Sequence, residues 1–143
     1  MKLKVLSFSG ENFFWNHAIS ITVMTSSWEI TLLDNHAPMI TSLEPCVLYI
    51  TYIDNNNMKQ KEGFAIGKWV LEVQSSEVKI LSDMLIDVEG VDVAQALDAK
   101  EKALQLMEQY KHKKDKIDME KFIEAEDTLM KSIVQLKLYD TKK

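Results

Sequence analysis

The sequence predicts an α+β fold that is mainly β: an N-terminal antiparallel β-sandwich of about eight to ten strands, then a C-terminal antiparallel two-helix hairpin. Apolar and polar residues alternate in short runs through residues 2–85, which is typical of strands with one buried face. Turn-forming residues separate these runs. Good helix formers dominate beyond Asp87, and the last glycine is Gly90. We therefore expect a sandwich domain over residues 1–86 and a helical hairpin domain over residues 87–143.

Five runs carry the strand signal, because every second residue in each is apolar. They are Ile19, Ile21 and Val23; Trp28, Ile30 and Leu32; Cys46, Leu48, Ile50 and Tyr52; Trp69, Leu71 and Val73; and Val78 and Ile80. The turn signals are Ser9-Gly10, Thr25-Ser26-Ser27, Asp34-Asn35, Glu44-Pro45, residues 54–57 and residues 74–76. Short strands at regular spacing, without a helical pattern between them, favour an antiparallel sandwich or a flattened barrel.

The hairpin is predicted from two amphipathic segments that flank the polar stretch at residues 112–116. Asp92 is placed to cap a helix that begins near Val93, and Asp118 is the expected cap of the second helix. The first apolar stripe is Val93, Ala94, Leu97, Leu104 and Met107, beside the small residues Ala96, Ala99 and Ala103. The second stripe is Phe122, Ile123, Leu129, Met130, Ile133, Val134 and Leu136. Neither helix is apolar enough to form a core, so the hairpin must pack on itself, on the sandwich or on a partner.

Composition argues against several functions. The net charge is −5, and all 17 basic residues are lysine. A chain without arginine lacks the groups that read guanine edges and bind phosphate in two-pronged fashion, so we expect no nucleic-acid partner. Cys46 is the only cysteine, which excludes an intramolecular disulfide and fits a reducing compartment. There is no apolar run of about 20 residues, as a membrane helix needs, and no signal peptide, so we expect a cytoplasmic protein.

The candidate chemical groups do not form a recognisable site. His17, His36 and His112 lie in three separate predicted elements, so we expect no metal site. Cys46 and His36 could form a nucleophile pair, but no nucleophile elbow or oxyanion glycine run accompanies them, which favours a buried structural thiol. The four glycines are scattered, so no phosphate-binding loop is present. The residues alone therefore predict a sandwich with a hairpin and no catalytic residue.

Four segments resemble a known family. "LLDNHAPMITSLEPCVLYI", residues 32–50, is similar to the His-Ala-Pro turn and the following strand of the epsilon subunit of F-type ATP synthases. Residues 62–85 resemble that family's Gly-Gly-Phe strand and the next strand. Residues 91–104 and 125–138 resemble its two C-terminal helices. The resemblance covers nearly the whole chain in order.

The resemblance implies a sandwich of roughly ten strands followed by a two-helix hairpin. It also implies a non-catalytic part of the rotating central stalk, in which the sandwich binds the gamma subunit and rests on the c-ring. The hairpin would meet the alpha and beta subunits, which hold the catalytic sites. No cofactor or metal is implied. The expected location is the cytoplasmic side of a bacterial inner membrane, where the protein would be a peripheral subunit. An organelle-encoded copy is the other possibility.

The resemblance assigns an interface role to two residues of the sandwich. His36 would face the polar loops of the c-ring, and Glu29 would be its partner on that side. This sequence departs from the family pattern around both. Trp28 and Thr31 replace glycines, and Asp34 replaces a proline, so the loop shape near the c-ring is expected to differ.

The hairpin carries two further departures. Some relatives bind ATP through an Ile/Leu-Asp-x-x-Arg-Ala motif; Asp92 and Ala96 remain here, but Gln95 stands at the arginine position. Losing the guanidinium removes a charge-assisted phosphate contact, which predicts weak or absent ATP binding. The resemblance implies that relatives inhibit ATP hydrolysis through basic residues of the second helix that meet acidic residues of the beta subunit. Between residues 118 and 140 this chain has six acidic residues and three lysines, so we predict weak inhibition, with Lys131 and Lys137 as its best carriers.

Two alternatives remain at the level of the sequence. One is a free-standing β-sandwich adapter whose helices bind a different partner, which would require solubility without gamma and no association with a membrane sector. The other is a small enzyme with a cleft near His36 and Cys46, which would lose an activity on His36→Ala or Cys46→Ser.

Overall fold

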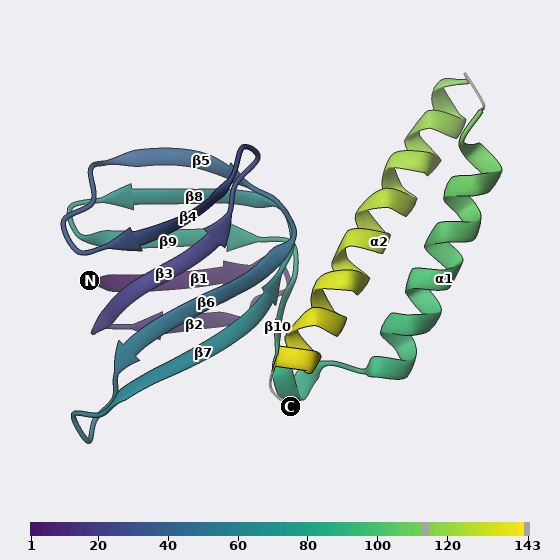
Figure 1. Cartoon of the computed structure of the whole chain (residues 1–143). Coiled ribbons are helices and arrows are strands. Elements are labelled where there is room, and N and C mark those ends of the chain that lie inside the picture. The colour runs from purple at the N-terminus through teal and green to yellow at the C-terminus, as the bar shows by residue number, and fades with distance from the viewer. Residues whose placement is uncertain (113–114, 142–143) are drawn as a thin grey trace.

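The computed structural model describes residues 1–112 and 115–141, which form a two-layer β-sandwich and a helical hairpin (Figure 1). Ten strands of the described residues make two five-stranded sheets. The first sheet, in the order β2-β1-β9-β8-β5, contains β1 (Lys2–Ser7), β2 (Asn12–Trp15), β5 (Met39–Leu43), β8 (Trp69–Gln74) and β9 (Glu77–Ser82). The second, in the order β10-β7-β6-β3-β4, contains β3 (Ala18–Met24), β4 (Glu29–Leu33), β6 (Cys46–Ile53), β7 (Lys59–Ile66) and β10 (Leu85–Asp87).

The alternating residues fill the space between the two sheets, as predicted. The largest side chains of this core are fully buried; they include Leu3, Ile21, Leu32, Leu48, Ile50, Ile66, Leu71 and Ile80. One strand pair departs from the antiparallel prediction, because β1 runs parallel to β9, with Leu3 opposite Val78. The two strands come from opposite ends of the sandwich in sequence, so no tight turn forces them to be antiparallel.

Three predicted core residues point to solvent instead. A bulge between Ala18 and Ser20 shifts the register of β3, so Ala18 is 3% exposed whereas Ile19 is 38% exposed. An extra residue at a bulge reverses the side-chain alternation on one side of it. Trp28 lies before β4 and Trp69 begins β8, and both are mostly exposed. The alternation in the sequence thus begins one residue before the strand at Trp28, and at Trp69 it begins on the first residue of the strand, where the side chain is still exposed.

The two helices are α1 (Val93–Tyr110) and α2 (Lys116–Thr141), preceded by a short 3-10 helix, η1 (Val88–Gly90). The predicted cap of α1 is confirmed, because the Asp92 side chain accepts a hydrogen bond from the backbone N–H of Gln95. The predicted cap of α2 is wrong. Asp118 lies inside the first turn, where a carboxylate still favours the helix dipole, and Asp115 precedes the helix. Residues 113 and 114 of the predicted polar break lie outside the described residues.

The hairpin packs both on itself and on the sandwich. Small side chains separate the helices, and the buried ones are Ala96, Ala103, Ala125 and Ser132. The larger Leu97 and Leu104 of the predicted stripe are about half exposed. α2 lies between α1 and the sandwich and contacts β6 and β7 (Figure 1). No helix in the described part of the chain is both long and apolar enough to cross a membrane.

Candidate functional site at the hairpin–sandwich interface

An apolar contact joins α2 to the outer face of the second sheet. Val47 of β6 and Ala65 of β7 form a buried cluster with Val134 and Leu138 of α2. Gly63 of β7 lies beneath the helix, because a Cβ atom there would stand 3.1 Å from Leu138 Cδ1. These residues point away from the sandwich core, and their neighbours on the same strands point into it. β6 and β7 are therefore covered on both faces where the helix docks.

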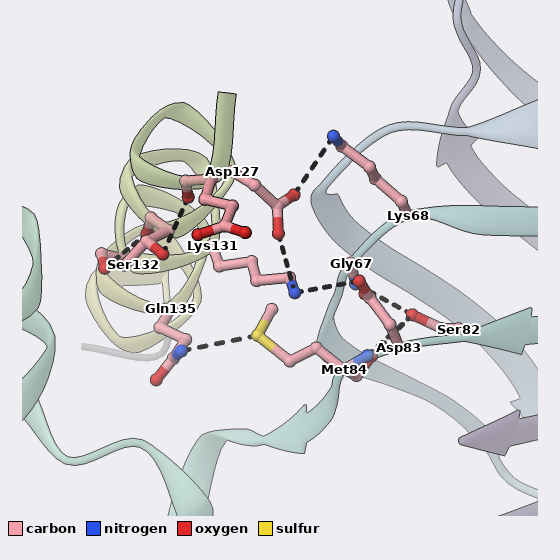
Figure 2. Close-up of polar contacts among 11 residues, drawn as sticks. Gly67, Lys68, Ser82, Asp83, Met84, Asp127, Lys131, Ser132 and Gln135 are labelled. Carbon is pink, nitrogen blue, oxygen red and sulfur yellow. Dashed lines mark hydrogen bonds and ion pairs between the residues drawn. The ribbon is translucent and has the colours of Figure 1, made fainter. Parts of the chain in front are cut away.

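A charged cluster extends the interface toward the ends of the strands (Figure 2). The Lys131 ammonium on α2 donates to Asp83 Oδ2 at 2.9 Å, across the interface, and lies 2.9 Å from Asp127 Oδ2 on the same helix. Lys68 of the sandwich lies 3.4 Å from Asp127 Oδ1. The four charges sum to zero, and two of the three ion pairs join the hairpin to the sandwich.

The cluster is only partly open to water. The side chains of Lys131, Asp83 and Asp127 are 24%, 25% and 21% exposed. Burial lowers the pKa of the Lys131 ammonium, but the hydrogen bonds that it donates to Asp83 and Asp127 outweigh this effect, and the net pKa is raised. Asp83 Oδ1 and Asp127 Oδ1 are buried and accept no hydrogen bond from the described residues, although the Lys68 ammonium forms its 3.4 Å ion pair with the latter. The carboxylates therefore depend on the lysines for compensation.

The backbone around Asp83 is held by a buried serine. Ser82 Oγ accepts from the backbone N–H of Gly67 at 2.9 Å and donates to the carbonyl of Met84 at 2.7 Å. This arrangement ties the connection after β7 to the connection after β9. Gly67 leaves the room that Asp83 occupies, since a Cβ atom at Gly67 would overlap Asp83 Oδ1.

Beside the docked helix lies a cleft of about 590 Å³ that is lined by strands β2, β6, β7 and β10, by η1 and by the end of α2. Lys61 sits over the ring of Tyr49 there, with its ammonium 4.8 Å from the ring centre. The other charged lining residues are Glu62, Asp87 and Glu89. Three carboxylates against one ammonium do not favour a phosphate group in this cleft.

The residues assigned to the c-ring side lie elsewhere. His36 follows β4 in the connection to β5. Figure 1 shows that this connection lies at the end of the sandwich away from the hairpin. Its side chain is exposed, with Nδ1 2.7 Å from the carbonyl oxygen of Ala37, and Asn35 before it has a φ of 64°. Glu29 begins β4. The length of β4 therefore separates Glu29 from His36.

The remaining predicted residues lie apart from one another. Lys137 is exposed on α2, whereas Ala96 is buried between the helices and Asp92 is occupied as a cap. The Cys46 thiol accepts a 3.3 Å hydrogen bond from the backbone N–H of Met24. Burial raises the pKa of this thiol, which lowers the thiolate population that a nucleophile needs. In residues 1–112 and 115–141, no group of three His, Cys, Asp or Glu side chains could hold a metal ion.

Comparison with known proteins supplies the family. Residues 1–88 match the family model described as "ATP synthase, Delta/Epsilon chain, beta-sandwich domain". The chain belongs to the ATP synthase delta/epsilon chain family. The ATP synthase epsilon chain of Bordetella avium is 32% identical over 105 residues, 73% of this chain and 72% of that relative. The epsilon chain of Xylella fastidiosa is 29% identical over 126 residues, 88% of this chain and 83% of that relative.

Solved structures agree on the fold of this delta/epsilon chain, including the hairpin. A chain of the Euglena gracilis mitochondrial ATP synthase matches with a TM-score of 0.72 at 20% identity, over 94% of this chain and 78% of its own. A chain of the Tetrahymena thermophila mitochondrial enzyme matches with a TM-score of 0.64 at 14% identity, over 97% and 96%. Membership of the epsilon chain family makes the protein a non-catalytic subunit of an ATP synthase, and the free-standing adapter is not favoured.

Sequence reasoning missed most of the charged cluster. Asp127 and Lys131 stand at i and i+4 on a predicted helix, so their pair was visible in principle. Asp83 lies 48 residues before Lys131, in a turn, and nothing local connects them. Lys131 was predicted as a contact for a partner subunit, and in this structure it is engaged with the sandwich of its own chain.

Proposed function

We propose that the chain couples the gamma subunit to the c-ring in the central stalk of a rotary, proton-translocating ATP synthase. The observation that carries this proposal is the extent of the similarity, since both the sandwich and the hairpin are matched by ATP synthase chains. The structures that match come from mitochondrial ATP synthase assemblies that include the c-ring, and one of them is of the central stalk with the c-ring. The chain would act as a mechanical link, while catalysis would belong to the alpha and beta subunits.

The proposed location follows from those partners. A subunit that rests on the c-ring would be peripheral to the bacterial inner membrane, on its cytoplasmic side, and attached through the complex. We further propose that residues 1–86 and 87–143 act as two units, the first for attachment to gamma and the c-ring and the second for contact with alpha and beta. The apolar cluster between α2 and the sandwich has only four buried residues, which supports a separable hairpin.

His36 is the proposed c-ring contact on the sandwich. It is exposed in a connection between the two sheets, remote from the hairpin, and because Nδ1 faces the carbonyl of Ala37, Nε2 is the ring nitrogen left for a partner. Glu29 would contribute a second contact from the other end of β4 rather than pairing directly with His36. A His36→Ala chain is expected to retain gamma and to recover less c-ring.

Recovery of the complex from membranes tests the proposal. The tagged full chain would be expressed in its own host, and the bound subunits would be identified by mass spectrometry, with the untagged chain as control. Recovery of alpha, beta, gamma and c together is the expected result. Recovery of the chain alone, or with unrelated proteins, would mean that this family fold serves another use here.

A further inference from the structure

We propose that Lys131, Asp127, Asp83, Lys68 and Gly67 form an ionic latch that fixes where the hairpin docks on the sandwich and how often it leaves. Figure 2 shows the Lys131 ammonium between Asp127 of its own helix and the Asp83 turn of the sandwich. Docking is a property of the isolated chain, so this inference does not rest on the proposed stalk role. In an assembled enzyme, the latch would decide when Lys131 is free for another subunit.

The pairs differ in whether they depend on docking. Lys131 and Asp127 are four residues apart on α2, so their pair persists when the hairpin leaves the sandwich. The Lys131–Asp83 and Lys68–Asp127 pairs exist only in the docked form. Undocking therefore exchanges two ion pairs for hydration of Asp83 and Lys68. Partial burial makes the loss of a single partner costly, because the remaining charge is left without compensation.

The charges supply a specificity that the apolar contact lacks. Hydrophobic burial is non-directional, and a helix with apolar residues at Val134 and Leu138 can find similar burial after a small shift along β6 and β7. Only one placement brings Lys131 within 2.9 Å of Asp83 Oδ2 while Lys68 reaches Asp127. The latch therefore selects one register of α2 on the sheet.

Gly67 positions the carboxylate of the latch without carrying charge. Its missing side chain leaves the volume that Asp83 Oδ1 occupies, and Lys131 Cε stands 3.1 Å from the position of an added Cβ. A methyl group at Gly67 would turn Asp83 away from α2 and crowd Lys131. Gly67→Ala should therefore loosen the hairpin as Asp83→Asn does, although it changes no charge.

Spin-label distances in the full chain test the latch. Labels would be placed through Gln74→Cys on the sandwich and Glu120→Cys on the hairpin, both at exposed positions, in a Cys46→Ser background. One narrow distance distribution is expected for the otherwise unaltered chain. Asp83→Asn and Gly67→Ala should each lower the ratio of docked to undocked chains roughly tenfold, the size expected for losing one partner of a half-buried pair.

Two controls keep the test specific. Glu126→Gln removes the same charge from a neighbouring but exposed position of α2, and it should leave the distribution narrow. The exchange Asp83→Lys with Lys131→Asp should restore part of the docked population that either change alone removes. Circular dichroism of each variant would show that the sandwich is folded. Narrow, unshifted distributions in both Asp83→Asn and Gly67→Ala would overturn the latch.

Discussion

The carboxylate of Asp92 accepts a 3.0 Å hydrogen bond from the backbone N–H of Gln95, the residue that stands where ATP-binding relatives carry arginine. The bond satisfies one of the free donors in the first turn of α1. Asp92→Ala should therefore destabilise the hairpin by about 1 kcal/mol, measured by urea unfolding followed through the helical signal. Asp98→Ala, at an exposed position of the same helix, is the matched control and should change stability less. Equal losses of unfolding free energy in the two variants would show that the hydrogen bond of the cap does not stabilise the helix.

The same pair bears on nucleotide binding. Gln95 offers no guanidinium to a phosphate, and the cleft beside the end of α2 carries three carboxylates against one lysine. We expect no ATP binding tighter than roughly 100 μM, because a neutral amide cannot replace the charge-assisted contact. Isothermal titration calorimetry of the chain and of Gln95→Arg makes the comparison. Binding by the unaltered chain below that concentration would contradict the expectation.

The fold was predictable where the signal was local. Alternation located buried residues such as Leu48 and Ile50, and a single aspartate located the start of α1. The prediction that Ile19 faces the core was wrong because β3 has a bulge there, and a bulge depends on how the strand pairs with its partner strand. The contact between Lys131 and Asp83 was not predicted for a related reason. It forms only when the folded hairpin meets the folded sandwich, and the two residues lie 48 positions apart in the sequence.

The pKa of Tyr52 tests a hydrogen bond between β6 and β7. Its hydroxyl donates to Glu62 Oε1 at 2.6 Å, and this bond, with burial and the nearby carboxylates of Glu62 and Asp54, raises the pKa of Tyr52 to about 12. Because the folded-state pKa lies above the unfolded value of 10.0, the stabilisation is complete below pH 10 and is lost as pH rises toward 12. Glu62→Gln should bring the Tyr52 pKa down, as followed by phenolate absorbance against a Tyr52→Phe reference. An unchanged titration would show that the bond is absent in solution.

Removal of the hairpin measures its inhibitory strength. From residue 118 to residue 140 acidic residues outnumber lysines six to three, and Lys131 is engaged with Asp83. Repulsion from acidic residues of a partner would therefore leave little inhibition, with the exposed Lys137 as the remaining carrier. Deleting residues 88–143 should raise the rate of ATP hydrolysis by the assembled enzyme less than twofold. Such a change corresponds to less than about 0.5 kcal/mol in activation free energy. A strong rise in hydrolysis would show that the hairpin inhibits despite its charge.

The central claim, that this chain links gamma to the c-ring, is tested most directly by ATP-driven proton pumping. Membranes of its host lacking the chromosomal copy would be supplied with the full chain, and pumping would be measured per ATP hydrolysed. We expect that the full chain restores pumping and that His36→Ala restores it less well. If membranes that contain the folded chain pumped no better than membranes without it, the proposed link between gamma and the c-ring would be contradicted.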